Sequence, residues 1–541
     1  MTFATLRALH AVIGDALTEM ERVYAARSQG GTPLDYPSLD VPYYNNKNTA
    51  AHSSEAEAAE KLASDSAVVM AANHIVAACE QLAASVHRPF FSLMEGIMSG
   101  HLTACLGFLE ASNTVEILRE AGPGGLHIAE IARRVDEVLG SAGKSANGSP
   151  LDPDKLSHIL RLLATFHWIR EVRPDVFANN RLSALIDSGK TPEQLRDGPT
   201  QKYEGTDCIA ALVPMKSDEF FKSVAHITDT LLPNRDRATS LRKLLDQREA
   251  SESAPGYKLP FNLAFRTELP YFHWLELPEN KRRLKEFGVS MTGTRSWEVV
   301  ENIIETFPWK DLPKDSIVVD VGGGVGSTSV VLARAFPQLR FVVQDRSHVV
   351  QIAPSVWKGE QAELIKSGRV SFQTQDFFTP QPPSLQVAGL GSVPSPALFL
   401  IRGCTHNWPD VAVTPHHGTE LEPDLYARML RHLRDAASPT TKLLIVDVIL
   451  PHACYDDWAD GHDAIPGAER TLAPEGSPLL ANLGRASATG YQLDLSMLAM
   501  LDAKERTLRE ICALALSAGW KVSSMARAPG SVWAYVTAVP V

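Results

Sequence analysis

Hydrophobic and polar positions change their spacing along this chain, and the change divides it into regions. The first 86 residues predict two helices joined by a loop rich in Pro, Tyr and Asn. Residues 87–200 predict mostly short helices, and from about residue 281 short apolar runs, typical of buried strands, alternate with helical segments. We therefore expect an N-terminal helical extension (1–86), a helical domain (87–280) and an α/β domain (281–541).

A winged-helix unit is expected within the helical domain. In LSHILRLLATF the apolar residues recur at i, i+3, i+4 and i+7, which places them on one face of a helix that Asp154 would cap. The following WIREVRPDVFANN predicts a hairpin with Arg-Pro-Asp at its turn. Two helices and a hairpin in this order indicate a winged helix. The apolar positions are Leu156, Ile159, Leu160, Leu163 and Phe166.

The C-terminal region predicts a doubly wound sheet. Helices at about 326–335 and 507–519 separate some of its strands, and the short link between the last two strands predicts an antiparallel hairpin. The expected class is α/β, a doubly wound, mainly parallel seven-stranded Rossmann-like domain with one reversed strand. Strands are expected at 316–322, 340–345, 370–376, 397–403 and 442–450 and within WKVSSMARA and SVWAYVTAVP.

Composition and charge exclude several classes of protein. Of the 541 residues, 44% are hydrophobic and 21% charged, which is ordinary for a globular protein with more than one domain. A net charge of −11 gives no general attraction to nucleic acid or to anionic lipid. Six widely spaced cysteines without a CxxC pair argue against a disulfide framework and a structural zinc site, and they fit a cytoplasmic location.

Neither a signal peptide nor a membrane span is expected. The N-terminus has no basic segment followed by an unbroken apolar core, so it predicts an amphipathic helix. Asn73, His74, Glu80 and Gln81 interrupt the most apolar window near the N-terminus, which should therefore not cross a bilayer.

A glycine-rich loop lies where the first strand of the α/β domain turns into the first helix. Gly322, Gly324 and Gly326 form G-x-G-x-G there, and glycine lets the backbone approach a ligand closely. The dinucleotide fingerprint would need glycine at Ser327, so a cofactor held by its pyrophosphate is disfavoured.

Two acids at strand ends complete the predicted ligand site. Asp345 ends the second strand, where a carboxylate can accept hydrogen bonds from both hydroxyls of a ribose. Asp376 ends the third strand, where it can hold the amino group of an adenine with the Phe377 ring beside it. Together with the glycine loop, these acids favour S-adenosylmethionine (SAM) over NAD.

Six motifs carry a family resemblance. In chain order they are VVDVGGGVGSTS, FVVQD, QDFF, IRGCTHNWPD, LLIVDVILP and DAKERTLRE. In this order and spacing the chain resembles, over roughly residues 90–541, the SAM-dependent O-methyltransferases of the plant caffeic acid/isoflavone type and their fungal, basidiomycete-like relatives. The resemblance implies a methyltransferase domain that binds SAM, preceded by a helical domain that forms a homodimer and helps to wall the pocket of a small phenolic substrate.

The resemblance also implies roles for individual residues. Arg402 stands where plant members usually have lysine, and Asn407 stands where the family usually has Asp, which leaves the substrate and the reacting hydroxyl open. Cofactor contacts are implied for Gly322, Gly324, Asp345, Asp376, Phe377, Arg402, Phe287 and Met291. Met497 matches a methionine that packs on the substrate. Further substrate contacts are assigned to Asn407, Trp408 and His273, although His273 judged alone is more often a core residue.

The catalytic base implied by the resemblance is His406, flanked by the acids Asp447 and Glu505. A phenol titrates near 10, so methyl transfer needs a proton acceptor as well as alignment. From the residues alone, His406 could equally be a buried structural histidine, Asp447 an ordinary strand-end acid and Glu505 an acid at the start of the last large helix. No metal is expected, because His406 lacks a second His or Cys at ligand spacing.

Two other functions remain open from the sequence. One is a SAM-binding enzyme with other chemistry, such as decarboxylation or hydroxylation, whose members have generally lost the base; His406 argues against it. The other is a SAM- or DNA-binding regulator, but the acidic chain and the attached catalytic domain favour dimerisation for the winged helix. His416 and His417 could bind a metal, although adjacent histidines in a polar loop are more often solvated. Residues 1–86 have no counterpart in the plant enzymes, and the polar stretch at 246–260 predicts a surface loop.

Overall fold

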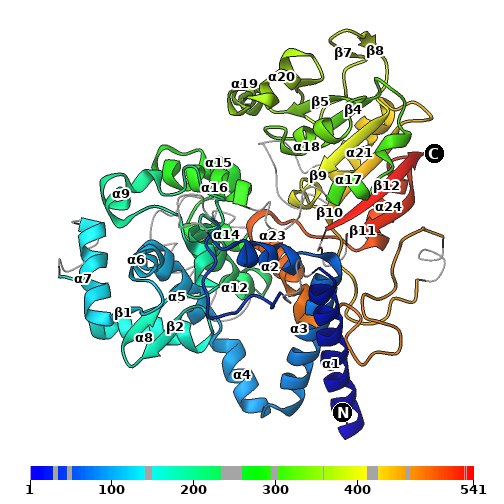
Figure 1. The fold of residues 1–541 in the computed structure, drawn as a ribbon. Helices are drawn as coiled ribbons and strands as arrows, with labels where there is room; N and C mark the ends of the chain where they lie inside the picture. The colour runs from blue at the N-terminus through cyan, green and yellow to red at the C-terminus, as the bar shows by residue number, and fades with distance from the viewer. Residues whose placement is uncertain are drawn as a thin grey trace. The chain divides into compact units, whose positions relative to one another are not determined.

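Figure 1 shows a computed structural model of the chain, which describes residues 2–27, 34–45, 52–140, 149–232, 259–293, 302–357, 359–410, 425–458, 464–528, 531 and 533–541. The chain forms two compact units. The sheet unit comprises Met1–Ala16, Met70–Leu82 and Trp297–Val541, and the helical unit comprises Leu17–Val69 and Ala83–Ser296. Residues 1–86 are therefore divided between both units, and the longest segment of the sheet unit begins at 297, where the sequence predicted a boundary at 281.

The helical unit contains the expected winged-helix element. The helices α7 (Ile128–Leu139) and α8 (Pro153–Thr165) precede a hairpin of β2 (Arg170–Arg173) and β3 (Val176–Ala178). The short strand β1 (Leu126–His127) pairs with β3 and completes a three-stranded sheet.

The helix α8 differs in detail from its prediction. Its N-cap is Asp152, whose side chain accepts a hydrogen bond from the backbone N–H of Asp154, because Pro153 occupies the first helical position. Phe166 is 48% exposed, since the helix has already ended at Thr165. The predicted apolar positions Leu156, Leu160 and Leu163 are fully buried, and Ile159 packs against the same core.

The N-terminal region holds three helices where the sequence predicted two. They are α1 (Phe3–Ala26), α2 (Ser54–Ala63) and α3 (Ser66–Val86). The extra helix α2 is capped by the Ser53 side chain, and Asp65 caps α3 only two residues after α2 ends. The Asp65 cap separates α3 from α2, a break that a pattern of small apolar residues alone does not resolve.

The helix α3 is, by length and composition, the one described helix that could cross a membrane. A single helix of this kind is weak evidence of membrane insertion, because core helices pass the same test. Ala77 and Ala78 of α3 pack with Leu9 of α1 and with Leu479 and Leu483 in a small core of the sheet unit.

The other helices of the helical unit are short. They are α4 (Pro89–Met98), α5 (Gly100–Ala111), α6 (Thr114–Ala121), α9 (Pro192–Asp197), α10 (Leu212–Met215), α11 (Phe221–Val224), α12 (Ile227–Leu231), α14 (Pro260–Phe265), α15 (Tyr271–Leu275) and α16 (Lys281–Gly293).

The sheet unit is built on a seven-stranded sheet with the order β11-β12-β10-β9-β4-β5-β6. Neighbouring strands pair in parallel from β6 to β10, and β12 runs antiparallel to both β10 and β11. The predicted mainly parallel sheet with one reversed strand is confirmed. The strands are β4 (Ile317–Val321), β5 (Arg340–Asp345), β6 (Val370–Thr374), β9 (Leu398–Arg402), β10 (Lys442–Val448), β11 (Trp520–Arg527) and β12 (Trp533–Pro540).

β7 (Leu385–Val387) and β8 (Gly391–Val393) form a separate antiparallel pair that the sequence did not predict. Strands of three residues are too short to show a period of two. The helices of the sheet unit are α17 (Asn302–Glu305), α18 (Ser327–Ala335), α19 (Ser347–Val356), α20 (Glu360–Lys366), α21 (Leu425–Asp435), α23 (Ala488–Leu501) and α24 (Leu508–Ser517).

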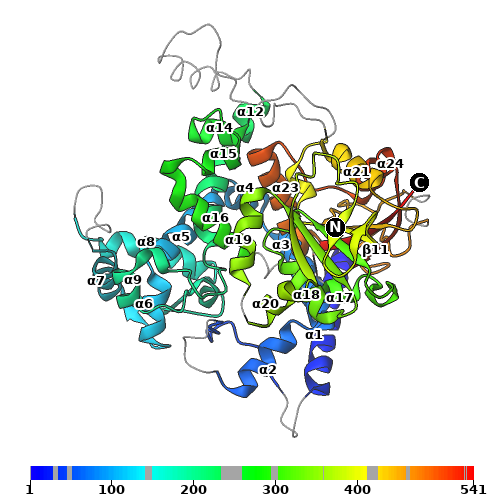
Figure 2. The ribbon, with the colours of Figure 1, turned by 90° about the horizontal axis from the view of Figure 1, so that it is seen from above.

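Helices cover both faces of the large sheet. Figure 2 shows α21 and α24 on one side of it and α17 and α18 on the other. Alternate residues of β4 face the α21/α24 side, where Val319 and Val321 share a core with Leu430 and Ile511. The strand order reverses between β4 and β9, so the loops that follow these two strands meet at one edge. In open α/β sheets this switch point is where ligands bind.

Candidate active site

The glycine-rich loop between β4 and α18 has the backbone that its sequence predicted. Gly322, Gly324 and Gly326 have φ values of +67°, +59° and +79°, a region that L-residues with a Cβ rarely adopt. A Cβ on Gly326 would lie 2.8 Å from the Trp357 ring, whereas a Cβ on Gly324 would meet no described heavy atom within 4 Å. The loop is therefore packed on its inner side and open at Gly324.

The loop connects directly with the second strand and with the loop after β9. The backbone N–H of Gly324 donates to Asp345 Oδ2 over 2.8 Å. A Cβ on Gly322 would lie 3.2 Å from Cys404 Sγ and 3.5 Å from the Phe377 ring. The structure thus brings together the glycine loop, Asp345 and Phe377, as the sequence predicted. Asp376 is exposed and lies two residues beyond β6, and its carboxylate accepts from the backbone N–H of Phe378.

A buried carboxylate lies at the end of β4, just before the glycine loop. Asp320 is 2% exposed at the end of β4 and accepts a hydrogen bond from Ser329 Oγ over 2.7 Å. Burial raises the pKa of Asp320 to about 6, although Ser329 and the Arg402 guanidinium oppose the change. No motif in the sequence indicated a role for Asp320.

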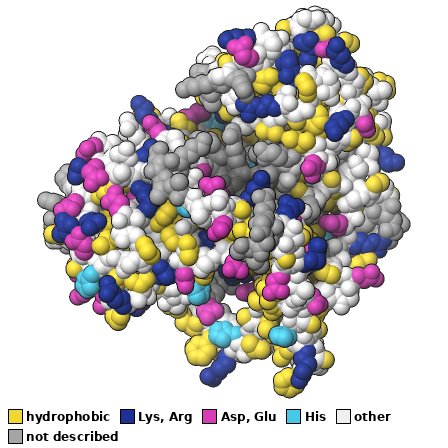
Figure 3. All heavy atoms as spheres, viewed as in Figure 1, with side chains coloured by type: hydrophobic (Ala, Val, Ile, Leu, Met, Phe, Trp, Pro, Cys, Tyr) yellow, Lys and Arg dark blue, Asp and Glu magenta, His cyan; other side chains and the backbone are white. Residues whose placement is uncertain are grey.

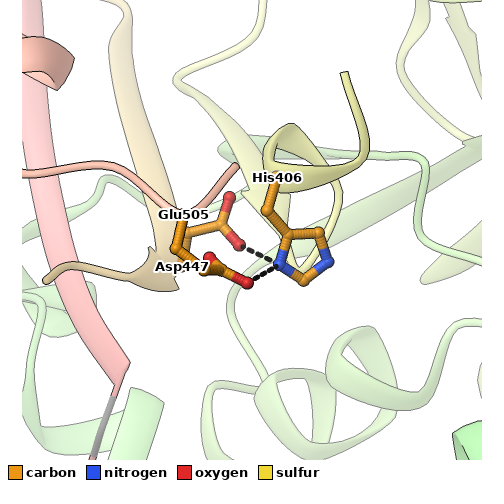
Figure 4. Close-up of side chains that lie close together, drawn as sticks. All are labelled: His406, Asp447 and Glu505. Atoms are coloured by element: carbon orange, nitrogen blue, oxygen red, sulfur yellow. Dashed lines mark ion pairs between the residues drawn. The ribbon is translucent and has the colours of Figure 1, made fainter. Parts of the chain in front are cut away.

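His406 lies in η8 (Thr405–Asn407), a short 3-10 helix that follows β9. Figure 4 shows two carboxylates converging on its ring from one side. The His406 Nδ1 atom is 2.9 Å from Glu505 Oε1 and 3.5 Å from Asp447 Oδ1, and the other ring nitrogen, Nε2, points away from both acids. Asp447 comes from β10, which is hydrogen-bonded to β9, and this explains why the two residues meet.

The two acids are held in different ways. Asp447 accepts a hydrogen bond from the Thr405 hydroxyl, which lies next to His406 in the chain. Glu505 has a fully buried side chain, and its backbone N–H donates to Asp494 Oδ1 over 2.8 Å. Its predicted place at a helix start is wrong. Glu505 lies in the linker before α24, which begins at Leu508, because Thr507 and Glu510 form the capping box of that helix.

The electrostatics of this cluster favour a charged histidine. Burial by itself lowers the pKa of His406, but the carboxylates of Glu505 and Asp447 outweigh burial and raise it to about 9. Burial likewise raises the pKa of Glu505, while its contact with His406 opposes the rise. A histidine whose Nδ1 faces two acids has one defined tautomer when neutral, with the proton on Nδ1 and the lone pair on Nε2.

Comparison with known proteins identifies the family. The O-methyltransferase domain model matches residues 260–460. An O-methyltransferase of Armillaria gallica is 37% identical over 466 residues, which are 86% of this chain and 87% of that protein. The chain belongs to the SAM-dependent O-methyltransferase family. A 4-O-methyltransferase 1 of Phanerochaete chrysosporium is 32% identical and covers 91% of each chain.

Solved structures share the fold at low sequence identity. The structure described as a LepI complex with SAM has a TM-score of 0.57 and 17% identity, and covers 90% of this chain and 100% of that chain. At this identity the likeness shows the fold alone, which agrees with the predicted Rossmann-like class.

The remaining predicted residues of the O-methyltransferase fall into two groups. Trp408 packs edge-on against Phe378, with ring centroids 4.7 Å apart, and Asn407 is half-buried beside it. Arg402 lies over the Trp533 ring at 5.1 Å, and Met497 is buried on α23. These four belong to the sheet unit, as do His406 and its acids.

Three predicted ligand residues belong to the helical unit instead. Phe287 lies on α16 and packs against the rings of Tyr271 and Phe272. Met291 is 40% exposed on the same helix, and His273 lies on α15. His416, His417 and the stretch at 240–258 lie outside the described residues.

The trio could also hold a metal ion. The ligand atoms of His406, Asp447 and Glu505 lie within 4.8 Å of one another. The spacing of His and Cys in the sequence did not indicate a metal site here, because the three possible ligands come from η8, β10 and the linker before α24, which only the fold brings together.

Proposed function

We propose that this protein transfers the methyl group of SAM to a hydroxyl of a small phenolic or other aromatic compound, with His406 as the general base. The observation that carries the proposal is the orientation of the imidazole: Nδ1 faces Glu505 and Asp447, and Nε2 is left to face an acceptor. A histidine base held in this way by a carboxylate contributes typically about 10²–10⁴-fold to a rate.

In the proposed reaction His406 accepts the proton, and Glu505 and Asp447 stabilise the charge that forms on it. Bound SAM supplies an electrophilic methyl on a sulfonium. As the phenolic oxygen forms its bond to that methyl carbon and the carbon–sulfur bond breaks, the phenolic proton moves to His406 Nε2. Glu505 and Asp447 hold the proton on Nδ1 and stabilise the imidazolium that results. The trio needs no metal for this step, and we infer that it works without one.

The cofactor site is proposed on the glycine loop and the strand ends beside it. The open side of Gly324, the Asp345 carboxylate in contact with that loop and the nearby Phe377 ring are suited to a ligand with a ribose and an adenine. A neighbour with the same fold is described in complex with SAM, which supports the assignment. Gly322, Asp376 and Arg402 complete the proposed cofactor set in the sheet unit.

The acceptor site is proposed beside His406. Met497 offers an apolar, polarisable surface to an aromatic ring, and Trp408 is proposed to line the same pocket. Asn407 is neutral where the family usually has an acid, so it can both donate and accept a hydrogen bond to a second substituent of the acceptor. The presence of Asn407 in place of the usual acid is proposed to affect which hydroxyl of the acceptor reacts. The enzyme is proposed to be cytoplasmic and to use neither nucleic acid nor membrane as a partner.

Methyl transfer from labelled SAM tests this function directly. The purified protein is incubated with mono- and polyhydroxylated aromatic acids, catechols and flavonoids, with and without a chelator such as EDTA. We expect a labelled methyl ether from at least one phenol, at a rate that the chelator does not change. SAM binding without transfer to any phenol would contradict the proposal and favour other chemistry on this scaffold. A loss of activity with EDTA that added metal restores would instead place a metal in the trio.

A homodimer is proposed from the surface of the helical unit. Every residue of α4 is at least partly exposed, and Phe90, Leu93 and Ile97 are 64%, 59% and 67% exposed. Figure 3 shows hydrophobic side chains at the lower edge of the molecule, where Figure 1 places α4. An apolar helix without cover is typical of an interface.

Charged substitutions on α4 should therefore break the dimer. We expect Phe90→Glu with Ile97→Glu to shift the protein from dimer to monomer in sedimentation equilibrium at micromolar concentration, because burying two carboxylates in an apolar interface is unfavourable. Leu516→Glu is the matched control, since Leu516 is 60% exposed on α24. A wild-type monomer, or a dimer that survives both substitutions, would refute this assignment.

A further inference from the structure

Arg506 follows Glu505 in the chain and is one of the largest fully buried side chains of the protein. Its guanidinium reaches back to the segment that carries His406. Nε and Nη2 donate to Asp410 Oδ1 over 2.9 and 2.7 Å, Nη1 donates to the carbonyl oxygen of Thr405 over 3.1 Å, and Nη2 donates to that of Trp408 over 2.7 Å. One side chain therefore binds the backbone on both sides of His406.

The backbone of Arg506 is fixed as well. Its carbonyl oxygen accepts from the N–H of Leu450 over 2.9 Å, and Arg506 forms a parallel bridge with Ile449, two residues after Asp447. The guanidinium lies 4.4 Å from the centre of the Tyr426 ring. Arg506 thus joins the three segments that supply His406, Asp447 and Glu505.

Asp410 forms the other half of this contact. Its second oxygen, Oδ2, lies 2.9 Å from Lys504 Nζ, and Lys504 also pairs with Glu510 of α24. Arg506 and Lys504 hold the pKa of Asp410 below its usual value despite burial. Asp410 is therefore a charged anchor at the end of the His406 segment.

We propose that Arg506 is a positioning residue of the methyl-transfer reaction, which holds the segment 405–410 so that His406 Nδ1 stays on its two acids and Nε2 faces the acceptor. This inference rests on the proposed function of His406. A fork of donors can bridge two carbonyls and a carboxylate at once, which a lysine ammonium cannot do with the same geometry. Partners that orient a metal-bound histidine typically contribute about 10–100-fold to activity, and we expect the same order of effect for Arg506.

Arg506 also acts on His406 through its charge. The positive guanidinium opposes protonation of His406, against the two carboxylates that favour it. Asp447 and Glu505 face the imidazole directly, Asp494 lies behind Glu505, and Asp410, Lys504 and Tyr426 surround Arg506. Removing the guanidinium charge should therefore raise the pKa of His406, a change that a purely structural role would not produce.

The test uses Arg506→Met, Arg506→Lys and Asp410→Asn in the full chain, with Arg509→Met as control. Arg509 lies in the first turn of α24, is half exposed and pairs with Asp456. We expect Arg506→Met to lower kcat by about 10–100-fold, to change KM for SAM less than threefold, and to move the rise of kcat/KM with pH to higher pH. In Arg506→Lys the rise of kcat/KM should occur at the same pH as in the wild type, but kcat should be only partly restored.

Several outcomes decide between the positioning role and its alternatives. An unchanged kcat in Arg506→Met, or a lower kcat with an unmoved pH profile, overturns the proposal. If Arg506→Met does not fold, Arg506→Lys and Asp410→Asn decide, and full kcat in both overturns it. His406→Gln, run in parallel, separates the two hypotheses: if it stays active, the proposed function fails, whereas an inactive His406→Gln beside fully active Arg506 variants refutes only the positioning role.

Discussion

His406→Gln is expected to lower kcat by about 10²–10⁴-fold while SAM binds as tightly as in the wild type. Glutamine has a similar reach and can still donate a hydrogen bond to Glu505, so the segment should keep its place. It cannot take up the phenolic proton, however, and the transition state loses its base. Single-turnover transfer from labelled SAM measures the step, and calorimetry with SAM measures binding.

An exposed histidine provides the control for this variant. His158 is exposed on α8 in the helical unit, and His158→Gln should keep full activity. If His406→Gln retains activity within about tenfold of the wild type, alignment alone drives methyl transfer and His406 is structural. If it loses SAM binding as well, the variant has disturbed the glycine loop, since Cys404, two residues before His406, would lie only 3.2 Å through its Sγ from a Cβ on Gly322.

The sheet could be predicted from the sequence because its strands carry their own signal. The runs around Ile317–Val321 and Lys442–Val448 are apolar almost without a break, as parallel strands covered on both faces must be. Once the strand order is that of a doubly wound sheet, the residues after β4, β5 and β9 must share one edge. That is why Gly324, Asp345 and His406 could be predicted as parts of one site.

Other parts of the site depend on contacts that no local pattern encodes. Nothing near Arg506 in the sequence indicates that its guanidinium binds the carbonyls of Thr405 and Trp408, about a hundred residues away in the chain. The burial of Glu505 could not be predicted from the sequence for a related reason. Its position just before an apolar helix is typical of a capping acid, and only the competing cap at Thr507 shows otherwise.

The pH dependence of kcat/KM follows from the same cluster. The pKa of His406 is about 9 in the free protein, so at neutral pH the imidazole is mostly protonated and Nε2 carries no lone pair. Because the base must be neutral, kcat/KM should rise about tenfold per pH unit below that pKa and level off near it. The profile is measured between pH 6 and 10 with labelled SAM. A plateau reached at pH 6.5 would show that the two acids do not charge the histidine.

Glu505→Gln tests whether the histidine or the phenol controls the pH dependence of kcat/KM, since a phenol also titrates in the alkaline range. The variant removes the carboxylate nearest to Nδ1, so the imidazolium is less stable, the pKa of His406 falls and the rise of kcat/KM should move to lower pH. Its plateau should fall as well, since the transition state forms the same imidazolium. Asp447→Asn should act in the same direction but less, because Asp447 lies farther from Nδ1. The rise of kcat/KM with pH could instead shift with the pKa of the acceptor and stay unchanged in both variants. The titrating group would then be the phenol, and not the histidine.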